Sequence, residues 1–260
     1  ALIPEIQTHF SKRKSKKYIK TNGAVKKMQR RLIIQEDPKS PISEAYRGLR
    51  TSLMYSNKEN NNGNVILVSS SGPGEGKTTT IANLAITYAN LGKKTLLIDS
   101  DLRKPVVHKV FNISKEPGLT SYLSGSINDI SKLIVKTEIN NFDVISSGVI
   151  PPNPSELLNS KKMSTFVKEA KEKYDVILFD SPPLIAVTDA YVLLNYTDQF
   201  VLVVRAGVTE KGGLKEVLSD FSLTKNTIDG VVMNAVNEEH SYGSGYYYNY
   251  YQYYYGENNT

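Results

Sequence analysis

Six short apolar runs recur along the central part of the chain, each separated from the next by a longer polar or amphipathic stretch. They cover residues 65–69, 95–99, 142–146, 175–180, 200–204 and 228–233. In several of them the apolar residues follow one another without interruption, which is typical of strands buried on both faces of a parallel sheet. The pattern therefore predicts six strands with intervening segments long enough to cross over the sheet.

The stretches between these runs predict helices at residues 77–91, 154–173, 188–195 and 211–223. Gly92 follows the first of them, where glycine commonly ends a helix in the left-handed conformation. Alternation of strands and helices indicates an α/β fold, a doubly wound and mostly parallel sheet. In such folds ligands bind at the carboxyl ends of the strands.

The chain divides into three parts by composition. Residues 1–31 hold ten Lys or Arg and one acid, so they read as an extended basic arm. Such an arm commonly meets anionic lipid or nucleic acid, or is simply solvated. Residues 32–237 carry the α/β pattern. Residues 238–260 include eight tyrosines in the ten positions 246–255 and lack aliphatic residues, which predicts a disordered tail.

Composition removes several classes of protein. With 260 residues, 40% hydrophobic and 22% charged, the chain is neither collagen nor a coiled coil nor wholly disordered. The sequence has no cysteine, which excludes disulfides, thiolate metal sites and a cysteine nucleophile, and permits a reducing cytoplasm. It shows no apolar run of about 18 residues and no signal peptide pattern.

A phosphate-binding loop follows the first apolar run. Residues 71–78 read SGPGEGKT, and the predicted helix begins at Lys77. Glycines let backbone N–H groups surround phosphates at a helix N-terminus, Lys77 adds a positive charge, and Thr78 offers a hydroxyl to Mg²⁺. Ser71 stands where the usual pattern has its first glycine. A glycine-rich turn with an accidental lysine is the alternative interpretation.

Two further apolar runs end in carboxylates. Asp99 and Asp101 close the second run and are followed by Arg103, while Asp180 closes the fourth in the Walker B form. Mg²⁺ prefers one or two carboxylates together with water and phosphate, so three acids leave one spare. That spare carboxylate is a candidate base for an attacking hydroxyl. Each aspartate alone also suits a strand-end cap.

These motifs together resemble the bacterial tyrosine kinases of the polysaccharide co-polymerase systems, and in particular the CapB type of capsule synthesis. The matching stretches are SSSGPGEGKTTT, LLIDSDLRKP, VILFDSPP and the tyrosine cluster. Residues 37–50 also resemble the family's E-x-x-R-x-x-R helix, in Glu44, Arg47 and Arg50, which the family uses to assemble a ring. A solvated charged face is the alternative for that triplet.

The resemblance implies an ATP- and Mg²⁺-dependent protein-tyrosine kinase of the P-loop NTPase type. It implies that nucleotide is held by Gly72, Pro73, Gly74, Glu75, Gly76, Lys77, Thr78, Thr79 and Asn234, with the metal at Thr78, Asp99, Asp101 and Asp180. The implied catalytic set is Lys77, Asp99, Asp101, Asp180 and Arg103, with Asp99 the candidate base. The alternatives are a turn residue for Asn234 and an ion pair to Asp99 or Asp101 for Arg103.

The family's substrate is its own C-terminal tail. The resemblance implies phosphoacceptors at Tyr242, Tyr246, Tyr247, Tyr248, Tyr250, Tyr251, Tyr253, Tyr254 and Tyr255. The 24 residues beyond Val236 are long enough to reach a neighbouring subunit, which favours phosphorylation in trans. Aromatic self-association or carbohydrate stacking is the alternative role for this tail.

Residues 1–27 resemble a different protein, the cytoplasmic tail of the CapA-type transmembrane modulator that activates these kinases. The resemblance implies a fusion of modulator tail and kinase, or else a single chain cut after its membrane span; a dispensable leader is a third possibility. It implies cytoplasmic localisation at the inner face of the membrane, a cognate tyrosine phosphatase and no nucleic acid partner.

Two rival functions share this fold. One is a nucleotide-dependent switch like ParA or MinD, although those proteins have a signature lysine where this chain has Gly72. The other is a scaffold that binds ATP only to organise polysaccharide synthesis.

Overall fold

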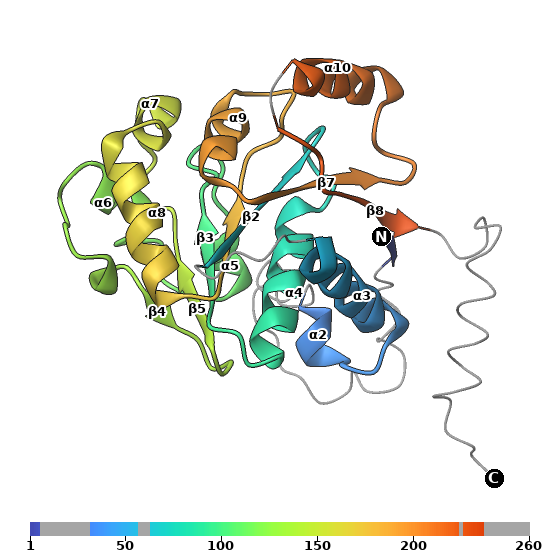
Figure 1. Ribbon diagram of the computed structural model, residues 1–260, viewed down its shortest axis with the longest axis horizontal. Helices are drawn as coiled ribbons and strands as arrows, with labels where there is room; N and C mark the ends of the chain where they lie inside the picture. The colour runs from blue at the N-terminus through green and yellow to red at the C-terminus, as the bar shows by residue number, and fades with distance from the viewer. Residues whose placement is uncertain (6–31, 57–62, 224–225, 237–260) are drawn as a thin grey trace, which may run out of the picture.

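The computed structural model describes residues 1–5, 32–56, 63–223 and 226–236. In the described residues one eight-stranded sheet has the order β1-β8-β7-β2-β6-β3-β5-β4 (Figure 1). All pairs are parallel except β4 with β5. The strands are β1 Leu2–Pro4, β2 Asn64–Ser70, β3 Thr95–Asp99, β4 Val135–Lys136, β5 Phe142–Ile145, β6 Val176–Asp180, β7 Gln199–Arg205 and β8 Gly230–Val236. The predicted doubly wound sheet is confirmed.

The two faces of the sheet carry separate cores, because alternate side chains of a strand point to opposite faces. On β2, Val65 and Leu67 join one apolar cluster, whereas Ile66 and Val68 join the other. All seven residues of β2 are buried. This explains why the central strands read as continuous apolar runs rather than as alternating patterns.

Helices cover both faces. They are α2 Ile33–Glu36, α3 Pro41–Ser56, α4 Lys77–Asn90, α5 Val107–Val110, α6 Leu119–Leu123, α7 Pro154–Leu158, α8 Lys161–Lys173, α9 Asp189–Leu193 and α10 Lys211–Ser222, with 3₁₀ turns η1 Ile130–Lys132 and η2 Leu194–Tyr196. Gly92, just beyond α4, has the expected left-handed φ of 84°. The single helix predicted at 154–173 is wrong. Ser160 caps a second helix there by accepting a hydrogen bond from the Met163 N–H.

The beginning of the segment interpreted as an extended arm forms strand β1. It lies beside β8, and Leu2 is in register with Met233 (Figure 1). Ile3 is fully buried in the same cluster as Val232, whereas Leu2 points outward and is 56% exposed. Residues 6–31, with the Lys/Arg cluster, lie outside the described residues.

Ile3 and Leu2 form a matched pair for testing β1. We expect Ile3→Ala to lower the free energy of unfolding by about 2 kcal/mol, since it removes buried methylenes and leaves a cavity. Leu2→Ala removes an exposed side chain and is expected to change it by less than ~0.5 kcal/mol. Urea unfolding followed by circular dichroism measures both, and equal losses would show that β1 does not pack as described.

Candidate nucleotide site

The predicted phosphate loop lies where β2 ends and α4 begins, next to the carboxyl ends of β3 and β6. The Lys77 ammonium lies 3.1 Å from Asp101 Oδ2 and 3.7 Å from Asp180 Oδ1. The Thr78 hydroxyl donates to Asp180 Oδ2 at 2.6 Å. The structure therefore brings together a cation, a hydroxyl and two carboxylates that are far apart in the sequence.

Asp99 is the third carboxylate of this cluster. Asp99 and Asp180 are direct partners in the register of β3 with β6, and both are fully buried. One Asp99 oxygen accepts the Val107 N–H at 3.0 Å, whereas Oδ1 of Asp99 and Oδ1 of Asp180 have no hydrogen-bond donor. Two buried carboxylate oxygens without a donor fit a site for a divalent cation.

The charges of the cluster depend on one another. Burial raises the pKa of Asp99 well above its ordinary value, and the nearby Asp180 charge raises it further. Burial likewise raises the pKa of Asp180, against the opposing effect of Lys77. For Lys77 burial by itself lowers the pKa, but Asp180 and Asp101 outweigh it, so the pKa is raised and the ammonium stays charged.

The loop is held by hydrogen bonds that the sequence did not predict. The Glu75 carboxylate is buried and accepts hydrogen bonds from the Ser71 hydroxyl at 2.7 Å and the Thr209 hydroxyl at 2.7 Å. The Asn234 amide donates to the Glu75 carbonyl at 3.0 Å. Ser71, the departure from the usual glycine, thus serves as a donor to Glu75. Asn234 fixes the loop here, and its contact with a nucleotide base stays a prediction.

Two glycines of the loop allow the cost of backbone strain to be distinguished from the cost of steric crowding. Gly74 and Gly76 both have left-handed φ, 77° and 99°. A Cβ on Gly74 would meet nothing within 4 Å, but one on Gly76 would lie 2.1 Å from the Asn234 Nδ2.

We therefore expect Gly74→Ala to destabilise the protein by about 1–2 kcal/mol through the left-handed backbone alone. Gly76→Ala is expected to cost more and to weaken ADP binding, since Asn234 must move. Adding Asn234→Ala to Gly76→Ala should then recover part of the loss. Thermal unfolding and ADP titration measure these effects, and equal behaviour of the two single variants would contradict the crowding.

Arg103 does not pair with Asp99 or Asp101, so that alternative is wrong for its side chain. Its guanidinium binds both oxygens of Asp189, at 2.9 Å each. Hydrogen bonding to Asp189 raises the pKa of Arg103 above its ordinary value. Asp189 is fully buried at the start of α9, and no local pattern in the sequence points to it, because 86 residues separate the two partners.

Glu44, Arg47 and Arg50, the residues predicted to assemble a ring, all lie on α3 but make different contacts. Glu44 and Arg47 form an ion pair of 2.6 Å on the surface. Arg50 turns inward and donates to the Thr87 carbonyl of α4 at 2.8 Å. Their place in an interface between subunits stays a prediction.

The predicted phosphoacceptor tyrosines, from Tyr242 to Tyr255, lie outside the described residues. Among the residues that are described, no helix is long and apolar enough to span a membrane. Within the same residues, no three His, Asp or Glu side chains form a metal-binding group, so a cation at Asp101 and Asp180 would need oxygens of Thr78, phosphate or water as further ligands.

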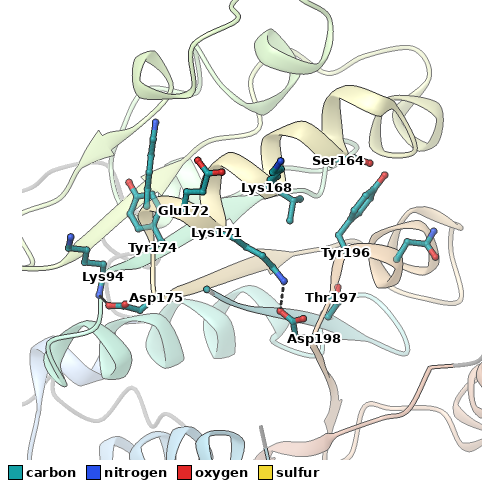
Figure 2. Close-up of a pocket in the computed structure, with 14 residues that line it drawn as sticks. Lys94, Ser164, Lys168, Lys171, Glu172, Tyr174, Asp175, Tyr196, Thr197 and Asp198 are labelled. Atoms are coloured by element: carbon teal, nitrogen blue, oxygen red, sulfur yellow. Dashed lines mark hydrogen bonds and ion pairs between the residues drawn. The ribbon is translucent and has the colours of Figure 1, made fainter. Parts of the chain in front are cut away.

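A polar cavity lies elsewhere, near the amino-terminal ends of β6 and β7 and at the opposite edge of the sheet from Lys77 (Figure 2). Its volume is about 800 Å³. It contains the ion pair of Lys171 with Asp198, 2.8 Å apart (Figure 2). None of the predicted site residues lines it.

The fold and the loop together define a P-loop nucleotide-binding protein. The family model described as an AAA domain matches residues 63–233. The chain belongs to the bacterial tyrosine-protein kinases. It is 41% identical to the tyrosine-protein kinase YwqD of Bacillus subtilis over 221 residues, 85% of this chain and 92% of YwqD. It is 37% identical to the putative tyrosine-protein kinase CapB of Staphylococcus aureus, over 87% of this chain and 95% of CapB.

Solved structures agree. The chimerical protein CapA2B2 is 38% identical, with a TM-score of 0.76 over 80% of this chain and 91% of that one. The kinase domain of the Escherichia coli tyrosine kinase ETK is 31% identical, with a TM-score of 0.79 over 93% of this chain and 91% of that one. The family resemblance drawn from the motifs is confirmed.

Proposed function

We propose that this chain is an ATP- and Mg²⁺-dependent protein-tyrosine kinase that phosphorylates the tyrosine cluster of its own C-terminal tail. The observation that carries the proposal is the cluster at the phosphate loop, where Lys77 lies between Asp101 and Asp180 while Asp99 keeps one oxygen without a donor. Membership of the tyrosine kinases supports the choice of acceptor.

The residues divide the chemistry as follows. The left-handed backbone at Gly74 and Gly76 presents N–H groups to phosphates at the start of α4, and Lys77 neutralises charge on them. Thr78, Asp180 and Asp101 would hold Mg²⁺, which when bound offsets the negative charge of the transferring phosphate. Asp99, whose pKa is raised by burial, is suited to accept the proton of an incoming tyrosine hydroxyl.

Phosphorylation is proposed to occur in trans, within a ring of subunits. The tail follows β8, and its 24 residues reach tens of ångströms even when half extended at about 3.3 Å per residue. Each added phosphate brings about −1.5 to −2 charges, which repel the aspartates of the site and release the product tail. Glu44, exposed on α3, and Arg47, partly exposed beside it, are the residues proposed for contact between subunits.

The similar proteins support proposals about the partner of this kinase, its location and its cellular role. The likeness to the CapA2B2 chimera supports the proposal that residues 1–27 correspond to a modulator tail and that the kinase works with a transmembrane modulator at the inner face of the membrane. The likeness to CapB supports a role in capsular or exopolysaccharide synthesis. A tyrosine phosphatase would reverse the modification.

A nucleotide-dependent switch is the second candidate. The cell-division ATPase MinD of Pyrococcus furiosus is 26% identical with a TM-score of 0.56 over 66% of this chain and 71% of that one. Gly72, where such switches have their signature lysine, counts against this candidate.

Peptide mass spectrometry after incubation with ATP and Mg²⁺ distinguishes the two. The kinase is expected to carry phosphate on residues 242–255. ATP hydrolysis with an unmodified tail would favour the switch, and ATP binding with neither reaction would favour the scaffold.

A further inference from the structure

Asp101 begins a short turn, residues 101–104, beside the nucleotide site. The Asp101 carboxylate itself stabilises the conformation of this turn. Asp101 Oδ1 accepts the backbone N–H groups of Arg103 at 3.3 Å and Lys104 at 2.9 Å. Asp101 Oδ2 accepts the Lys77 ammonium at 3.1 Å. The orientation of this carboxylate toward the phosphate loop is therefore set by the backbone of residues 101–104.

The side chain of Arg103 ties this turn to a different part of the fold. Nε and one terminal nitrogen of Arg103 bind the two oxygens of Asp189, at 2.9 Å each, in a fork that lysine cannot reproduce. Ser155, on α7, also donates to Asp189 Oδ1. Asp189 is buried, and within the described residues its carboxylate accepts hydrogen bonds from the side chains of Arg103 and Ser155.

We infer that Asp189 is a positioning residue for the nucleotide site: through Arg103 it holds the turn 101–104, and so aims Asp101 at Lys77 and the bound metal. Arg103 then acts on the turn and not on phosphate or substrate. Both oxygens of Asp101 are engaged, one by Lys77 and the other by the turn, so the direction of this carboxylate follows the backbone of residues 101–104.

This inference rests on the proposed role of Asp101 toward Mg²⁺, and it is tested by binding rather than by phosphorylation. ADP affinity is measured by calorimetry with and without Mg²⁺, on wild type, Asp189→Asn and Arg103→Lys. Both variants are expected to lose about five- to twentyfold in affinity with Mg²⁺ and less than twofold without it. The Asp189→Asn/Arg103→Lys double variant is expected to lose no more than the worse single variant.

Lys171→Met is the matched control. It removes the partly buried ion pair with Asp198, 2.8 Å long, at the opposite edge of the sheet (Figure 2). It is expected to lower the melting temperature and to leave both affinities unchanged. Should the other variants fail to fold, Ser155→Ala removes one donor to Asp189 and keeps the ion pair, and a two- to threefold loss confined to Mg²⁺-ADP is expected.

Three results would overturn the inference. Asp189→Asn or Ser155→Ala with wild-type affinity in both conditions would make the pair a purely structural one. An equal loss with and without Mg²⁺ would indicate general distortion of the loop. A loss in Lys171→Met that matches the other variants would mean that any lost ion pair has this effect. A wild type that binds Mg²⁺-ADP but never phosphorylates its tail would contradict the proposed function and leave this inference to be decided by the affinities.

Discussion

Lys77→Met is expected to abolish phosphate on the tail, with a loss of at least about 10³-fold in rate. The substitution removes the only cation that the structure places between Asp101 and Asp180, among the residues it describes. Phosphate oxygens would then face those carboxylates without compensation. Intact-mass spectrometry over a time course of ATP and Mg²⁺ measures the loss.

The control for this variant is Lys94→Met, which removes an exposed lysine beside the cavity at the other edge of the sheet. It is expected to phosphorylate its tail at the wild-type rate. A Lys77→Met protein that is folded by circular dichroism and still gains phosphate would show that another site carries out the reaction.

The second large expected effect is the phosphorylation of one chain's tail by the active site of another chain. A donor with all nine tail tyrosines replaced by phenylalanine keeps its site but has no acceptor there, whereas the Lys77→Met chain keeps its acceptors and lacks the site. When the two are mixed with ATP and Mg²⁺, we expect phosphate on the Lys77→Met chain. Neither protein alone should become labelled.

Dilution provides the control for the mixture. Transfer between subunits depends on concentration, so the rate should fall as the mixture is diluted. Reversing the surface charge with Arg47→Glu, which breaks the pair with Glu44, should lower it further. A mixture without label, together with a wild type that labels itself at every dilution, would establish transfer within one chain.

The fold was largely predictable because its strands are local features of the sequence. The run at residues 95–99 has three consecutive aliphatic residues at its centre, and the observed strand β3 has the same bounds. The phosphate loop was equally visible, since a strand, glycines, Lys77 and a helix follow one another without interruption. In both cases the signal is contained in fewer than twenty residues.

Apart from the division of the predicted helix 154–173 at Ser160, the failed predictions depend on contacts between distant segments. Strand β1 has three residues, and it exists because β8, more than 200 residues away, offers a parallel edge. The partner of Arg103 was missed for the same reason, as Asp189 reads simply as the start of a helix. Glu75 was predicted to hold nucleotide, and its hydrogen bond from Thr209 was missed because that residue lies far away in the sequence.

Helix α4 connects the phosphate loop with the contact to helix α3. One end carries Lys77 and Thr78, and near the other the Thr87 carbonyl accepts the hydrogen bond from Arg50 of α3. Its 14 residues span roughly 21 Å, and most of its side chains are buried along that length. We expect a helix packed in this way to move as a rigid body, so that a displacement of α3 at Arg50 also shifts Lys77 and Thr78. Contacts made by α3 and nucleotide binding at the phosphate loop are then expected to influence each other.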